Sequence, residues 1–208
     1  MPVAIVHLDE SCLGNGREGE NPGGGGGLVE ARTRGGRLER RDIYIHAPAT
    51  TNNRMALSGA ITTLELLGRK QVRLSVLVVS DSEYLVKGMR EWVPGWIVRG
   101  WKRKTGPIEN LELWQALDAA ARRHHVQWTW VRGHRGHAKN EYANDLAVRA
   151  AREQISSEGL VPSGFGDWLA AKRKKGLYLA YDPDAAFAGL EARAASEEPF
   201  PLADAPVP

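Results

Sequence analysis

The sequence is poor in the residues that define several common classes of protein. Its single cysteine, Cys12, excludes an internal disulfide and a cysteine-built zinc site, and it favours a reducing cytoplasm. The apolar run Val76–Val79 in the middle of the chain is far shorter than the roughly 20 residues that cross a bilayer. The N-terminal residues lack the basic start of a secretion signal. We therefore expect a cytoplasmic protein with no membrane partner.

Negative charge is scarce in most of the chain and is concentrated near its end. The 208 residues carry a net charge of +3, yet residues 182–204 hold six acidic residues against one arginine, which leaves residues 1–181 near +8. A basic body of this kind suggests a polyanionic partner. The length is enough for one full-sized core, so we expect one domain with an appendage.

The pattern of residues 1–154 predicts a mixed α/β domain. The glycine-rich stretch 14–27 is expected to be a loop, Gly35–Gly36 a hairpin turn, and Asn53 the cap of the first helix, which ends at Gly68. Apolar periodicity predicts strands at 3–8, 28–34, 38–46, 72–80 and 126–131, and helices at 53–68, 82–89, 109–123 and 140–154.

Residues 155–208 differ in character from the predicted domain at 1–154. They are expected to form a linker, a short helical or docking segment, and an acidic, proline-rich disordered tail at 197–208. The basic run Lys172–Lys175 is interpreted as a solvated face or as a further phosphate contact.

Acidic residues end two of the predicted strands. Asp9 follows the first strand, Asp81 follows the strand at 72–80, and Asn144–Asp145 lie on the last helix of the domain. With no cysteine nearby, carboxylates at neighbouring strand ends suit hard cations such as Mg²⁺ or Mn²⁺.

Five segments resemble the ribonuclease H family of the bacterial ribonuclease HI type. They are LDESCLGN at 8–15, TTNNRM at 50–55, SDSEYLVKGM at 80–89, WQALDAA at 114–120 and WVRGHRGHAKNEYANDLA at 130–147. The resemblance implies an α/β, ribonuclease H-like five-stranded mixed sheet, its first three strands antiparallel, flanked by helices and followed here by a C-terminal extension. It also implies hydrolysis of the RNA strand of RNA/DNA hybrids with two Mg²⁺ or Mn²⁺ ions held by four carboxylates.

Two of the four family carboxylates are Asp9 and Asp81, and the other two are replaced by Ala56 and Asn144. The Asn144 amide can still coordinate a cation, whereas Ala56 cannot. The candidate substitutes are Glu141, one turn before Asn144, and Glu10, which on a continuing strand would point away from Asp9 unless the chain turns there.

Three hypotheses follow. The chain is a nuclease with an atypical, weakened site, a catalytically impaired module that binds hybrids or double-stranded RNA, or an interaction domain that uses the fold without nucleic acid. By the resemblance, the loop residue His134 assists proton transfer or product release.

The resemblance also implies contacts with the hybrid, and we expect the protein to be a monomer. Asn52 and Asn53, with either Asn15 or Asn21, match asparagines that read the minor groove, and Cys12 and Thr51 match backbone or phosphate contacts. The basic protrusion at 87–105 is expected to grip the DNA strand. The two tryptophans of this protrusion are also candidates for simple packing. Its candidate contact residues are Trp92, Trp96, Arg99, Lys102, Arg103 and Lys104.

Overall fold

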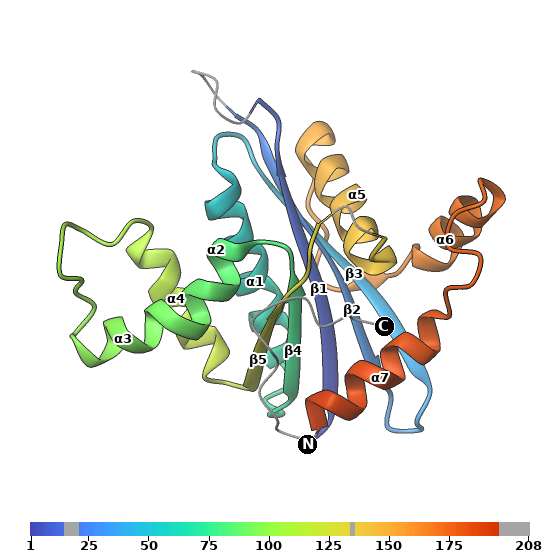
Figure 1. Cartoon of the computed structure of the whole chain (residues 1–208), viewed down its shortest axis with the longest axis horizontal. Helices are drawn as coiled ribbons and strands as arrows, with labels where there is room; N and C mark the ends of the chain where they lie inside the picture. Colours follow the sequence, from blue (N-terminus) through green and yellow to red (C-terminus); the bar gives the residue numbers. More distant parts are fainter. Residues whose placement is uncertain (15–20, 134–135, 196–208) are drawn as a thin grey trace.

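A mixed six-stranded sheet forms the centre of the molecule, with helices on both faces (Figure 1). The computed structural model describes residues 1–14, 21–133 and 136–195. The strands lie in the order β5-β4-β1-β2-β3-β6. Their bounds are β1 (Val3–Cys12), β2 (Gly23–Arg32), β3 (Leu38–Ala47), β4 (Ser75–Ser80), β5 (His125–Trp130) and β6 (Val161–Pro162).

The predicted fold is confirmed, with one addition. Strands β1, β2 and β3 are antiparallel, and β4 and β5 run parallel to β1. The sheet has six strands rather than five because Val161–Pro162, in the C-terminal extension, pairs with Arg41 and Asp42 of β3. The extension therefore contributes a strand to the sheet.

Eight helical segments connect and cover these strands in the described chain. Thr51 caps the first of them, since its hydroxyl accepts a hydrogen bond from the Arg54 amide, so the prediction of Asn53 as the cap is wrong. Pro94 lies in the first turn of a helix, where no amide donor is needed. The segments are α1 (Asn52–Gly68), α2 (Glu83–Lys87), the π-helix η1 (Gly88–Trp92), α3 (Val93–Val98), α4 (Leu111–Ala121), α5 (Ala138–Glu153), α6 (Phe165–Lys174) and α7 (Pro183–Ala195).

The run Gly23–Gly27 forms the first half of β2, so the loop predicted at 14–27 is wrong for these residues. The reason is close packing against α5. A Cβ atom on Gly24 would lie 2.1 Å from the Ala147 carbonyl oxygen, and one on Gly26 would lie 2.2 Å from that of Ala143. Only glycine allows the α5 backbone to approach the sheet this closely.

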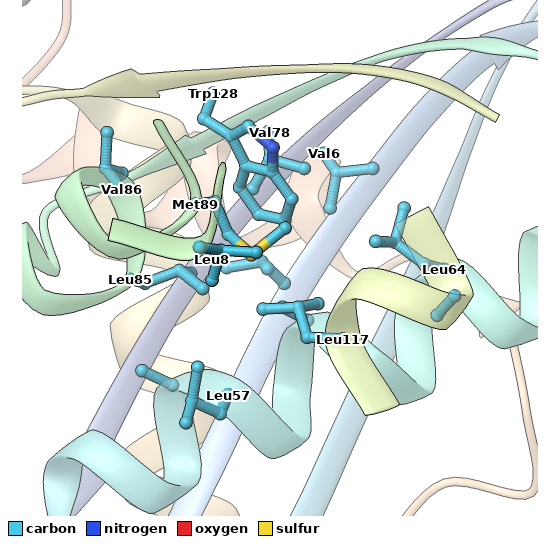
Figure 2. Close-up of a cluster of buried hydrophobic side chains, with 14 of the residues drawn as sticks. Val6, Leu8, Leu57, Leu64, Val78, Leu85, Val86, Met89, Leu117 and Trp128 are labelled. Atoms are coloured by element: carbon cyan, nitrogen blue, oxygen red, sulfur yellow. The ribbon is translucent and has the colours of Figure 1, made fainter. Parts of the chain in front are cut away.

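The larger core lies between the sheet and the helices α1, α2 and α4. Figure 2 shows Leu57 of α1 and Leu117 of α4 facing a cluster from β1, β4 and β5 that includes Trp128. Ala56 belongs to this core and is 5% exposed. The apolar repeat of α1 thus packs as its periodicity predicts.

The extension covers the other face of the sheet beside α5. Helix α7 packs on β1 and β4 (Figure 1). Its Phe187 and Leu190 are buried against Ile5 and Leu77. The predicted tail at 197–208 lies outside the described residues. No helix in the described chain has the length and apolar character needed to cross a membrane.

Candidate active site

Three carboxylates meet where β1 passes the end of β4. Asp9, Glu10 and Asp81 each place a carboxylate oxygen within 4.8 Å of the others. The parallel ladder of β1 and β4 ends at the pair Leu8–Ser80, and Asp81 directly follows that pair. The strand ends therefore bring Asp9 and Asp81 together, as the sequence predicts.

Glu10 joins this group although it neighbours Asp9 on the same strand. Adjacent side chains leave a strand on opposite faces, and β1 continues without a turn to Cys12. Beyond Leu8, however, β1 has no partner on the β4 side, so both side chains can reach Asp81 around the open edge. The Ser82 side chain interacts with the Glu10 carboxyl, and Ser82 begins α2 without a side-chain capping bond.

The close carboxylates hold their protons to unusually high pH. Burial, followed by the charges of Asp81 and Glu10, raises the pKa of Asp9 to about 9. Burial and the charge of Asp81 raise the pKa of Glu10 to about 8, although the bond from Ser82 opposes this shift. A divalent cation that binds these carboxylates would therefore displace their protons.

Helix α5 supplies amide groups to the same place. Asn140, buried in the first turn, donates its Nδ2 to Asp9 Oδ2 at 3.2 Å. Asn144 lies one turn further along α5, so it shares the face that Asn140 turns toward the acids. A Cβ atom on Gly133 would lie 2.3 Å from Asp81 Oδ2, so a larger residue at this place in the β5–α5 connection would displace the Asp81 carboxylate.

Ala56 and Glu141 stay outside the acidic cluster of the described residues. Ala56 packs in the apolar core, and Glu141 is hydrogen-bonded to Tyr178 of the extension. Of the two candidate substitutes, the structure therefore brings only Glu10 to the acids.

Three of the asparagines that are expected to read the minor groove lie together near the start of α1. The Asn21 carbonyl oxygen accepts from the Thr50 amide, which places Asn21 beside Thr51 and Asn52 at the start of α1. Asn53 follows in the first turn of α1. Cys12 lies opposite Gly23 in the β1–β2 ladder. His134 and Asn15 lie outside the described residues.

The basic protrusion at 87–105 comprises the last residue of α2, η1, α3 and the first part of the segment that leads to α4 (Figure 1). Trp96 is 9% exposed and packs with Trp92 and Trp114, so packing is one role of these tryptophans. Trp92 and Trp96 also line a cavity of about 410 Å³ together with Arg99 and Arg103. The exposed cations of the protrusion are Lys87, Arg99, Lys102, Arg103 and Lys104.

Three further residues contribute to the site without having been predicted. They are Ser82, Gly133 and Asn140. All three fall inside segments that resemble the family: Ser82 lies in the segment at 80–89, and Gly133 and Asn140 lie in the one at 130–147.

A mixed sheet with acids gathered at its strand ends and a basic face beside them is characteristic of a hydrolase that acts on nucleic acids. The chain belongs to the ribonuclease H family, since the model of the RNase H family matches residues 2–152. It is therefore a phosphodiester hydrolase of that family.

Relatives with a curated function support this assignment over most of their length. The chain is 44% identical to the ribonuclease H of Aromatoleum aromaticum, in an alignment that covers 76% of this chain and 96% of the relative. It is 42% identical to the ribonuclease HI of Caulobacter vibrioides, with 73% and 95% covered.

A solved structure matches the extension as well. The crystal structure of LC9-RNase H1, described as a type 1 RNase H with the type 2 active-site motif, is 48% identical to this chain. The two structures superpose with a TM-score of 0.75, and the match covers 99% of this chain and 90% of the other.

Proposed function

We propose that this chain hydrolyses the RNA strand of RNA/DNA hybrids at a site formed by Asp9, Glu10, Asp81 and Asn144. One observation carries the proposal: Glu10 reaches the two family carboxylates that the chain retains. It supplies the third carboxylate that Ala56 cannot. The weakened site expected from the sequence alone is on this account a rearranged site.

The residues fit divalent cations of the Mg²⁺ or Mn²⁺ type. All the donors are oxygens, as hard cations require. The raised pKa values of Asp9 and Glu10 have the sign expected of buried carboxyls that lie close to a further carboxylate. When bound, two such ions activate water and stabilise the leaving oxygen of a phosphodiester.

The protein's own part in the reaction is to hold these oxygens in place. Asn140 fixes Asp9 from α5, and Ser82 fixes Glu10 from the start of α2. Asn144 adds a neutral oxygen, which leaves substrate phosphates to supply the remaining negative charge. We assign the proton transfer or product release step to His134, which the family resemblance supports.

The hybrid is the proposed nucleic-acid partner. Minor-groove contacts by Asn21, Asn52 and Asn53 would detect the 2′-hydroxyl groups that distinguish RNA from DNA. The cations of the protrusion would bind phosphates of the DNA strand. The hydrogen bond from the Thr50 amide to the Asn21 carbonyl oxygen supports Asn21 as one candidate for the third asparagine, and Asn15 remains the other.

We further propose a monomer located in the cytoplasm. Every proposed ligand comes from one chain, so the site needs no second copy to complete it. A single cysteine suits a reducing compartment.

The test is cleavage of a hybrid labelled on each strand, with duplex DNA and single-stranded RNA as competing substrates. We expect cuts in the RNA strand of the hybrid alone, dependent on Mn²⁺ or Mg²⁺. Asp9→Asn and Asp81→Asn should each lower the rate by about 10²–10³. Binding of hybrid without cleavage by the wild type would replace this proposal with the binding module, and full activity in both variants would remove the site.

A further inference from the structure

A group of charged side chains lies between the sheet, α5 and α7, with a buried carboxylate at its centre. Glu30 of β2 is fully buried, and its Oε1 accepts from Arg40 Nε at 2.8 Å. Its Oε2 lies 2.7 Å from the Nζ of Lys139, which is 3% exposed. A buried carboxylate needs such partners because its charge is costly to remove from water.

The C-terminal extension completes this group. The Arg40 guanidinium also binds the Asp184 carboxylate, and Lys139 Nζ donates to the Pro183 carbonyl oxygen at 3.1 Å. Pro183 and Asp184 form the first turn of α7. Two cations then face two carboxylates, so the charges balance only when α7 is docked. We name the group of Glu30, Arg40, Lys139, Pro183 and Asp184 the latch.

The latch adjoins the site through consecutive residues of α5. Successive helix residues are turned by about 100°, so neighbouring side chains can serve different partners. Lys139 points to the latch, while Asn140 points to Asp9. Both line one cavity of about 80 Å³, whose walls also include Tyr181 and Leu190 of the extension.

We propose that the extension is a positioning element for catalysis: through the latch it fixes the first turn of α5 and so keeps Asn140 on Asp9. This rests on the proposed role of Asp9 as a metal ligand. The family match ends at residue 152, so Pro183 and Asp184 lie outside the matched domain. Lys139 and Asp184 act here as positioning residues and do not touch the substrate.

The chain offers a matched pair of variants for the test. Asp184→Asn removes the latch charge on α7 while keeping the shape of a side chain that is 70% exposed, so the fold should survive. Glu191→Gln makes the same change two turns along α7. Glu191 pairs with Arg32 of β2 and has no part in the latch. Both variants are made in the full chain.

Hydrogen exchange at residues 138–142 and calorimetry of Mn²⁺ binding without substrate are the two measurements. Asp184→Asn should speed the exchange about fivefold and weaken Mn²⁺ binding about threefold, with KM for the hybrid unchanged. Glu191→Gln should match the wild type in both. Lys139→Gln should exceed Asp184→Asn in both effects if it folds.

The inference would be overturned if Asp184→Asn exchanged hydrogen and bound Mn²⁺ as the wild type does. Equal changes in both α7 variants would also overturn it. Failure of the proposed function gives a different result. The wild type would then not cleave hybrid, although Asp184→Asn would still speed exchange in α5.

Discussion

The end of β1 and the second turn of α1 are two places from which a carboxylate could serve the same site. At residue 56, α1 carries a methyl group packed in the apolar core. At residue 10, β1 carries a carboxylate that reaches Asp9 and Asp81. The comparison indicates that the site requires a third carboxylate close to Asp9 and Asp81. A strand can supply this carboxylate in place of a helix.

The arrival of Glu10 at the cluster has an electrostatic consequence. Burial, followed by the charges of Asp81 and Glu10, raises the pKa of Asp9 to about 9. Burial, followed by the charge of Asp81, raises the pKa of Glu10 to about 8.

Glu10→Gln should have the largest effect. It removes one carboxylate oxygen charge from the cluster, so cleavage of hybrid should fall by about 10²–10³. Glu141→Gln is the control, because that carboxylate bonds to Tyr178 and lies outside the cluster. The two rates are compared at saturating Mn²⁺. Equal losses of cleavage rate in both variants would show that the Glu10 carboxylate contributes no more to the site than that of Glu141.

The stability of the metal-free protein should fall as pH rises from about 5 to 8. Unfolded carboxyl groups titrate near pH 4, whereas folded Asp9 and Glu10 keep their protons up to about 9 and 8, so the folded state binds more protons in this window. Thermal unfolding at several pH values measures the slope. Glu10→Gln should flatten it, and Mn²⁺ should stabilise the wild type more at pH 8 than at pH 6. Stability that rises with pH in this window would contradict the raised pKa values of Asp9 and Glu10.

Ala56→Glu should change cleavage least. With Glu10 in place, a carboxylate returned to α1 adds nothing that the site lacks, so the rate should change by less than about threefold. Burial of the new group should instead lower stability by about 1–3 kcal/mol. Chemical denaturation and the cleavage assay together check this. A tenfold gain in rate would mean that the site is incomplete without α1.

The sequence predicts the fold and two of the acids well because each signal is local. Periodicity marks the strands, and Asp9 and Asp81 stand directly at strand ends. The glycine run was misread because composition alone does not reveal how closely α5 packs on Gly24 and Gly26.

The sequence does not predict that Glu10 reaches Asp9 and Asp81, for a related reason. The alternation of side chains holds along a strand, but its consequence changes where the neighbouring strand stops, at Leu8–Ser80. That end point is a tertiary feature. The docking of Phe187 and Leu190 on the sheet is likewise set by contacts distant in sequence.

The most direct test of the account is calorimetric titration of Mn²⁺ into the wild type, Glu10→Gln and Glu141→Gln without substrate. If Glu10 is a ligand, its variant should bind Mn²⁺ at least tenfold more weakly, while Glu141→Gln should match the wild type. Identical binding by all three proteins would contradict the claim that β1 supplies the missing carboxylate.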